Sequence, residues 1–289
     1  MTKYTFPGGT YEGDAVNNLP HGSGVLELED GTHYEGEFVN GYKEGEGVET
    51  RADGTKYVGA FKQNRYDGFG IVNFPDGTIW EGTFKDGFPD GDVKIKHSHG
   101  GVLEIKYVNG VEAKIGRYTW PNGDSYQGEF VDGIKHGRGV FFFANGDIYS
   151  GDFFNEEMTG HATLHVSDGS YLEGEFVQGK PHGPAVLHLK EGDYIEANYE
   201  NGVIKGDITY YLKSGARYVG EIDGAKITGQ GTLYMPNGDK YVGAFKDAAL
   251  DGEGTYYFAS GNSFVGTFKD GDKVKGTYFY KDGTTKDFP

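Results

Sequence analysis

The sequence predicts an all-β fold, an elongated, twisted antiparallel meander of about twelve 23-residue β-hairpin repeats that forms a rod or trough. Three observations support this prediction. The chain repeats every 23 residues, each repeat alternates apolar and polar residues as a strand does, and Asn-Gly or Asp-Gly pairs separate the alternating segments. Glycine accounts for 51 of 289 residues without the three-residue period of collagen, so an ordered structure must use it.

The repeat keeps one phase over most of the chain. Eleven 23-residue units fit residues 11–263 without insertion or deletion. Residues 1–10 match the end of a preceding unit, and residues 264–289 form a degenerate terminal repeat with a C-terminal cap. The pattern is clearest in residues 34–56, YEGEFVNGYKEGEGVETRADGTK.

Each unit contains two predicted strands. In the first, aromatic residues and a glycine alternate with polar residues, as in Tyr34, Gly36 and Phe38, which places these three on one face. The second strand carries two glycines followed by two apolar positions on that same face, and the departures from these apolar positions are Glu49, Arg51 and His97. We expect the glycines to leave room for the rings to lie over neighbouring backbone.

Turn signals stand at both ends of the strands. They are Asn40-Gly41, Asp86-Gly87 and Asp132-Gly133 at one end, and Asp30-Gly31, Asp53-Gly54, Asn122-Gly123 and Asn237-Gly238 at the other. Such pairs permit the positive φ of tight hairpin turns. Because an isolated hairpin is marginal in water, each must pair with the next, and roughly 24 strands at ~4.8 Å would extend on the order of 110 Å.

The pattern Y-x-G-x-F-x-x-G-x-x-x-G-x-G, followed by an Asp/Asn-Gly pair and a new tyrosine, resembles the MORN repeat (membrane occupation and recognition nexus). The resemblance covers nearly the whole chain. It implies a non-enzymatic interaction module without cofactors, since members of that family act as scaffolds in ciliary, cell-division and cortical cytoskeletal assemblies. Partners would be an amphipathic helix or peptide in the trough and cytoskeletal components, with a homodimer through the terminal repeats as a further mode.

Composition bounds the partners and the location. The formal charge of −17 argues against nucleic acid and against a generally basic membrane-facing surface. There is no cysteine, which removes thiolate chemistry and fits a reducing compartment. We see no signal peptide and no apolar run long enough to span a membrane, so we expect a cytoplasmic, cytoskeleton-associated protein at a cilium, flagellum or cell cortex.

Three kinds of site are disfavoured by the repeat. The G-x-G pieces recur inside strands, without the helix N-terminus that a nucleotide loop needs. Paired carboxylates such as Glu35 and Glu37 recur along the outer face, as solubilising residues do, so we predict no catalytic residues. His97 and His99 share a face and could both reach one metal ion, but no third ligand is apparent, so we predict no metal site.

One segment departs from the acidic character of the chain. Residues 93–117 carry five basic residues against two acidic ones. We expect Lys94, Lys96 and Lys106 on the outer face of two adjacent strands, with like charges opposite one another. Such a patch could bind an acidic tail or a lipid headgroup, or it could be a solvated face. The predicted partner-binding residues are Lys94, Lys96, His97, Leu103, Ile105 and Lys106.

Two units lose the aromatic and the glycine together. Leu103 and Ile105 occupy these positions in one unit, and Ile195 and Ala197 in another. The exchange suggests volume compensation within a packed face, and we hypothesise that the rod bends or changes twist at these units.

The predicted function is a protein-binding scaffold in a cytoskeletal assembly, with a ciliary or axonemal complex as the expected setting. The setting rests on family analogy. One alternative is a membrane-cortex adaptor that binds anionic phospholipid through local basic patches, against which the charge and the lack of an amphipathic segment stand. Another is an extracellular hairpin array with choline-binding aromatic cages, which would need more tryptophan than Trp80 and Trp120.

Overall fold

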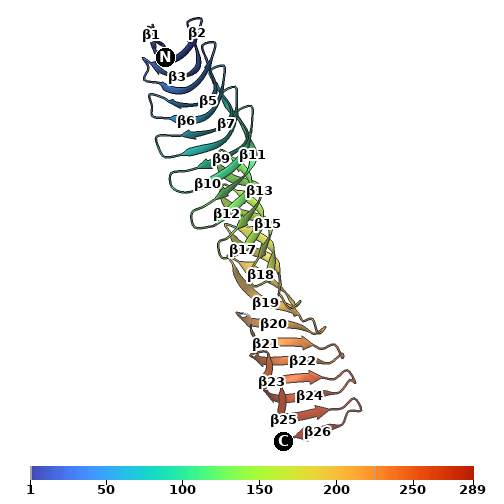
Figure 1. Cartoon of the computed structure of the whole chain (residues 1–289). Helices are drawn as coiled ribbons and strands as arrows, with labels where there is room; N and C mark the ends of the chain where they lie inside the picture. Colours follow the sequence, from blue (N-terminus) through green and yellow to red (C-terminus); the bar gives the residue numbers. More distant parts are fainter. Residues whose placement is uncertain (1, 225) are drawn as a thin grey trace. The chain divides into compact units, whose positions relative to one another are not determined.

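The structure is a computed structural model that describes residues 2–224 and 226–289 (Figure 1). These residues contain no helix, so none is available to cross a membrane. The chain divides into two compact units, residues 1–144 and 145–289, which are treated separately below. Both are built from antiparallel strands, so the predicted all-β meander of hairpin repeats is confirmed.

Within residues 2–144 of the first compact unit, each strand pairs only with the strands that precede and follow it in the chain. Figure 1 shows these strands succeeding one another. The strands are β1 (Thr2–Phe6), β2 (Gly9–Val16), β3 (Leu19–Leu28), β4 (His33–Val39), β5 (Tyr42–Thr50), β6 (Lys56–Lys62), β7 (Arg65–Asn73), β8 (Ile79–Lys85), β9 (Phe88–Lys96), β10 (Val102–Val108), β11 (Val111–Thr119), β12 (Ser125–Val131) and β13 (Ile134–Phe142).

The second unit repeats the arrangement over its described residues. Its strands are β14 (Ile148–Phe154), β15 (Glu157–His165), β16 (Tyr171–Val177), β17 (Lys180–His188), β18 (Tyr194–Glu200), β19 (Val203–Tyr211), β20 (Arg217–Asp223), β21 (Lys226–Tyr234), β22 (Lys240–Lys246), β23 (Ala249–Tyr257), β24 (Ser263–Lys269), β25 (Asp272–Phe279) and β26 (Thr285–Phe288).

The two ends of the strands use different turns. Between β4 and β5, Asn40 and Gly41 both have positive φ, 49° and 89°, as a two-residue hairpin turn of the predicted kind requires. At the other end only the glycine does, as at Gly31 with φ 88°. There the Asp30 carboxylate accepts a hydrogen bond from the Thr32 amide at 2.8 Å and closes a longer turn.

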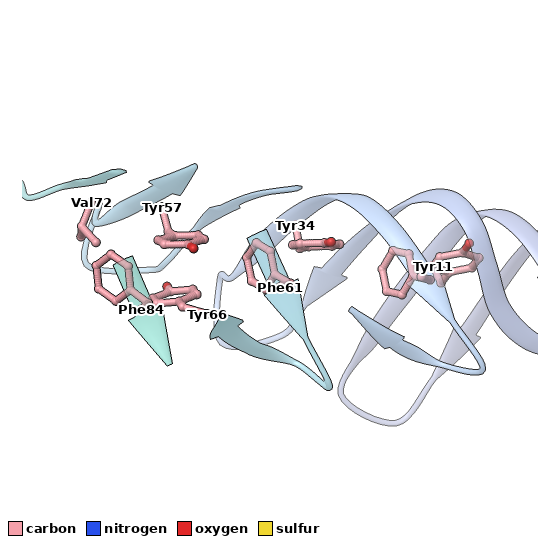
Figure 2. Packing of buried hydrophobic residues seen from close by; sticks show 8 residues of the cluster. Tyr11, Tyr34, Tyr57, Phe61, Tyr66, Val72 and Phe84 are labelled. Carbon is pink, nitrogen blue, oxygen red and sulfur yellow. The ribbon is translucent and has the colours of Figure 1, made fainter. Parts of the chain in front are cut away.

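The core of each unit lies on one face of its sheet and consists of rings over glycines. The first tyrosine of a repeat is fully buried, and its ring covers a glycine of the partner strand. A Cβ added at Gly47 would lie 2.5–2.7 Å from the hydroxyl oxygen and two ring atoms of Tyr34. Figure 2 shows Tyr11, Tyr34 and Tyr57 succeeding one another in a row. Glycine therefore stands beneath the ring in most units that begin with tyrosine, and the Tyr149 unit has the next smallest residue, Ala162, at this position.

The same tyrosine stabilises an irregularity in the hairpin. The register between β4 and β5 shifts between Gly36 and Glu37, which leaves a backbone carbonyl outside the regular ladder. The Tyr34 hydroxyl donates a hydrogen bond to the carbonyl of Glu37 at 3.0 Å. The corresponding bond recurs in the units that begin with Tyr11, Tyr57, Tyr126, Tyr149, Tyr218 and Tyr241.

Where the tyrosine is missing, other side chains fill its volume. Val93 occupies a glycine position in the second strand of the Trp80 unit and is buried, as is Ile105 in the next unit. Ile195 and Ile208 are buried in the same way in the second compact unit. The structure therefore confirms the volume compensation expected from the sequence, whereas the bend proposed at these units remains a hypothesis.

Candidate functional site

The residues predicted to bind a partner come from β9 and β10, and antiparallel pairing fixes their positions. Ile105 lies opposite Val93, and Glu104 lies opposite Lys94. Because adjacent side chains of a strand point to opposite faces, the predicted residues divide between two surfaces. The outer face holds Lys94, Lys96 and Lys106, whereas the aromatic face holds His97, Leu103 and Ile105.

A groove of about 810 Å³ runs over the outer face between β7 and β12. Lys94 and Lys106 line it together with Arg117, and two apolar side chains, Phe69 and Ile115, also border it. Phe69 is 56 % exposed and Ile115 is 62 % exposed, although both occupy a repeat position that is mostly polar elsewhere. The groove therefore combines apolar contact area with charges of both signs.

Two of the three outer-face lysines meet carboxylates, and none of the three lies opposite another cation, so the expectation that like charges lie opposite one another is wrong. Lys94 Nζ lies 3.7 Å from a Glu104 oxygen, and Lys96 Nζ lies 3.1 Å from a Glu81 oxygen. All four side chains are substantially exposed, and such pairs contribute little to stability. Their effect here is local neutralisation of the basic patch.

Two cations of the outer groove remain without an ion pair among the described residues, Lys106 and Arg117. Arg117 lies 3.4 Å from the Ser125 hydroxyl and 5.9 Å from the centre of the Phe142 ring. Both can therefore meet an acidic group of a partner without first breaking an intramolecular pair.

The aromatic face opens into a hollow of about 560 Å³ lined by Trp80, His97, Leu103 and Tyr118. Leu103 is half-buried at its wall, whereas Ile105 is only 5 % exposed and packs in the core beneath. A direct partner contact by Ile105 does not fit this burial. Ile105 supports the wall of the hollow from below.

His97 and His99 form a pair at the edge of the hollow. Their ring centres lie 5.2 Å apart at 17°, and His99 Nε2 lies 2.8 Å from the Tyr118 hydroxyl. Burial, and then the charge of a protonated His99, lower the pKa of His97 below its ordinary value, while Asp76 works the other way. In residues 2–224 and 226–289 no group of three or more His, Asp or Glu side chains is placed to hold a metal ion.

Two features of these surfaces are not among the predictions from the sequence. The first is the exposure of Phe69 and Ile115, which an apolar residue in a polar repeat column could have signalled. The second is a pair of outward-facing columns in the second compact unit that hold histidine and tyrosine in consecutive repeats.

Solved structures similar to this chain have low identity and low TM-scores. The TCP10c domain of Drosophila melanogaster Sas-4 matches with 15% identity over 61% of this chain and 98% of the domain, at a TM-score of 0.34. The TCP10 domain of Danio rerio CPAP matches with 14% identity over 87% and 98%, at 0.25. The Drosophila melanogaster SAS-4 TCP domain in complex with a proline-rich motif of Ana2 matches with 10% identity over 68% and 90%, at 0.29. At TM-scores below 0.5 these likenesses say nothing about what this chain binds.

A search of curated protein sequences returned no match. A family model described as "MORN repeat" does match, in ten segments that together cover well over half of the chain. The matched residues are 11–33, 34–56, 57–79, 80–91, 115–125, 126–148, 173–194, 218–240, 241–263 and 264–285. They include the ring-over-glycine cores and the hairpin turns described above. The chain therefore belongs to the MORN-repeat family.

Proposed function

We propose that this protein is a non-enzymatic protein-binding scaffold of the cytoplasm that works in a cytoskeletal assembly, with a cilium or axoneme as the leading setting. The observation that supports a binding role most directly is the outer groove. Phe69 and Ile115 expose more than half of their surface there, beside the unpaired cations Lys106 and Arg117. Exposed apolar area with a polar, charged rim is typical of protein interaction sites.

An amphipathic helix is the partner segment that we favour for this groove. Phe69 lies in β7 and Ile115 in β11, four strand spacings apart, which is about 19 Å. A helix that crosses the strands covers this length in about 13 residues, between three and four turns. Its apolar stripe would meet Phe69 and Ile115, and acidic residues beside that stripe would face Lys106 and Arg117. The sequence predicted that a partner helix lies in the trough, whereas the helix proposed here lies on the outer face.

Site-specific photocrosslinking in cell extract tests the proposal. A photoreactive residue is introduced at Phe69, at Ile115 and, as a matched control, at Gln230, which occupies the same repeat position in the second compact unit. We expect one protein to be crosslinked from both groove positions and not from the control. The helical segment that it contacts is then identified by mass spectrometry. Equal labelling from all three positions would contradict the proposal.

The lipid alternative makes a different prediction at the same surface. Glu104 and Glu81 neutralise Lys94 and Lys96, so we expect vesicles containing PIP₂ to retain little protein at physiological salt. Strong co-sedimentation that is lost on changing Lys94, Lys96 and Lys106 to Glu would favour the membrane adaptor instead.

Self-association through the terminal strands is a second part of the proposal. β1 and β26 each pair on one side only within their compact units, over the described residues. Such strands offer free backbone groups to a second copy, although Lys286 in β26 works against strand addition. Light scattering over a range of concentrations measures the mass directly, and a monomer at all concentrations would exclude this mode.

A further inference from the structure

A row of rings and cations projects from the outer face of the second compact unit, on the side opposite the aromatic core. Each member pairs across the strands with the next. The members are His165, Tyr171, His188, Tyr194, Tyr211, Arg217, Tyr234, Lys240 and Tyr257, and we call them the outer ladder. The equivalent columns of the first compact unit hold no such run, being occupied by residues such as Thr50, Lys56 and Asn73.

The outer ladder is built of stacked pairs, one for each hairpin. The pairs are Tyr171–His188 with ring centres 4.3 Å apart, Tyr194–Tyr211 with ring centres 4.4 Å apart, Arg217 at 4.4 Å from the Tyr234 ring and Lys240 at 4.5 Å from the Tyr257 ring. The two ring pairs are nearly parallel, at 11° and 13°. Pairs therefore recur every two strands, which is about 9.4–9.8 Å.

Parallel rings that face one another present their edges to solvent, and these edges carry free donors. Tyr234 is 39 % exposed and Tyr257 is 42 % exposed. Within residues 2–224 and 226–289, the hydroxyls of Tyr171, Tyr194, Tyr234 and Tyr257 have no hydrogen-bond partner. Beside the later members runs a row of short side chains, Thr209, Val219, Thr232, Val242 and Thr255. A ligand that lies along the ladder would meet ring edges on one side and β-branched side chains beneath.

The two cations of the ladder have no acidic partner. Arg217 and Lys240 form no ion pair with any described residue, although the chain as a whole has a formal charge of −17. Each instead lies over a tyrosine ring, which stabilises it without neutralising it. An acidic group bound at this end of the ladder would supply the missing charge.

From these observations we infer that the outer ladder binds a polyproline II segment of a partner protein, with acidic residues over Arg217 and Lys240. A polyproline II helix advances about 3.1 Å per residue and turns once every three residues, so one turn spans about 9.3 Å. That length matches the 9.4–9.8 Å period of the stacked pairs. A proline at every third position would therefore meet an equivalent pair at each turn along the ladder.

Hydrogen bonding favours the same conformation. A polyproline II segment makes no internal hydrogen bonds, so its carbonyls can accept from the tyrosine hydroxyls and from the Arg217 and Lys240 N–H groups. An α-helix has already used most of its carbonyls, and its 5.4 Å pitch does not match the period of the pairs. A partner strand that joins the sheet would need a free edge, which the ladder does not offer because it crosses paired strands.

Fluorescence anisotropy with the full chain and labelled peptides tests this inference. The probe is a peptide of about twelve residues with proline at every third position. It is made in two versions, one with a glutamate pair at the N-terminal end and one with the pair at the C-terminal end. The control peptide has the same composition with the three-residue spacing broken. We expect the two spaced peptides to differ in affinity, because only one of them places its glutamates over Arg217 and Lys240, and that one should bind best. Its affinity should fall as salt rises, because salt screens the attraction between the glutamates and these two cations.

Protein variants locate the binding. Tyr194→Ala with Tyr211→Ala should weaken binding about tenfold or more, since tyrosines of this kind dominate peptide recognition. Tyr194→Phe keeps the ring and should lose only the contribution of the hydroxyl. The matched control, Lys56→Ala with Asn73→Ala in the first compact unit, should bind as the unchanged protein does. Equal thermal melting of all variants confirms that the fold is intact.

Several results would overturn the inference. They are equal affinity for the spaced and scrambled peptides, unchanged binding by the double tyrosine variant, and no binding of any proline peptide up to about 1 mM, the weak end of specific recognition. Preferential binding of an amphipathic helical peptide that depends on Tyr194 and Tyr211 would assign the surface to a different partner.

Discussion

Lys43 and Glu49 form an ion pair inside the row of aromatic rings, with Nζ and Oε2 2.5 Å apart and both residues 7 % exposed. Tyr66 donates a hydrogen bond to the other oxygen of Glu49 at 2.8 Å, and Arg51 lies 3.2 Å from it. Lys43 also lies 4.7 Å from the centre of the Tyr34 ring. Glu49 and Arg51 therefore depart from the apolar columns as parts of one charged network, which occupies positions that hydrophobic residues fill in other repeats.

Breaking this pair from one side should be costly. We expect Glu49→Leu to lower the free energy of unfolding by about 3–5 kcal/mol, because it leaves the Lys43 ammonium buried without its counter-charge. Lys43→Met with Glu49→Leu together should recover most of that loss, since apolar residues fill these columns in other units. Chemical denaturation of the two single variants and the double variant measures the coupling. Additive losses would show that the two side chains act independently.

The pH dependence of stability should report on Glu49. Burial works to raise the pKa of its carboxyl, but hydrogen bonds from Lys43 and Tyr66 and the charge of Lys43 outweigh it, so the folded pKa lies below its ordinary value. A carboxyl with a depressed pKa stabilises the fold above its unfolded pKa of about 4.3, and this contribution is lost as the pH falls through the folded pKa.

The matched comparison is Glu49→Gln. Other carboxyls titrate in both proteins, so the difference in unfolding free energy between the original protein and Glu49→Gln isolates this one group. We expect the difference to be constant above about pH 5 and to shrink on acidification below about pH 4. A difference that grows toward low pH would contradict the depressed pKa.

The effects on stability of substitutions at the buried tyrosine and at the glycine beneath its ring should depend on each other. Gly47→Ala places a methyl group against the Tyr34 ring and should cost about 1–3 kcal/mol. In a Tyr34→Leu background the same change should cost less, because leucine places no ring or hydroxyl over the added methyl group, as in the natural pair of Leu172 with Ala185. The natural pair of Tyr149 with Ala162 sets the reference for a methyl group beneath a tyrosine. A thermodynamic cycle over the four proteins gives the coupling energy, and a value near zero would argue against ring-over-glycine packing.

The hydroxyl of the same tyrosine has a separate role. Tyr34→Phe keeps the ring but removes the hydrogen bond to the Glu37 carbonyl at the bulge, and should cost about 0.5–1.5 kcal/mol. Phe264 begins its unit with a ring that has no hydroxyl, so Phe264→Tyr serves as the reciprocal variant. Denaturant midpoints measure both changes. A cost well above this range for Tyr34→Phe would mean that the ring itself has moved.

Local stability should be low in the second strand of the repeat that begins at Ile195. β19 and β20 share only four ladder positions, from Ile208 opposite Gly220 to Tyr211 opposite Arg217, and Gly206 and Asp207 have no partner on either neighbouring strand among the described residues. Their amides should exchange with solvent about tenfold faster than that of Gly183, which lies opposite Tyr199 at the equivalent position in β17. Hydrogen exchange followed by NMR measures this directly. Equal protection would show that the shortened ladder does not loosen the sheet.

Much of the fold could be predicted from the sequence because it depends on short-range rules. Strand alternation assigned Tyr34, Gly36 and Phe38 to one face, and Asn40-Gly41 marked the turn, since both effects act within a few residues. The second turn type could not be predicted in this way, because it depends on a hydrogen bond that the Thr32 amide donates to the Asp30 carboxylate. The alternation of apolar and polar residues predicts the strands, but it does not predict which hydrogen bonds form within a loop.

By itself, then, the sequence determined the 23-residue hairpin, the two faces and the family. Only the tertiary structure decided which charges meet and which side chains stay free. Lys94 faces Glu104, and Arg217 lies over Tyr234, because antiparallel register and the bulge in each hairpin bring residues together across strands. The register depends on how two backbones pair, and a shift of one residue would exchange the two faces of a strand. It therefore cannot be derived from the sequence of a single repeat.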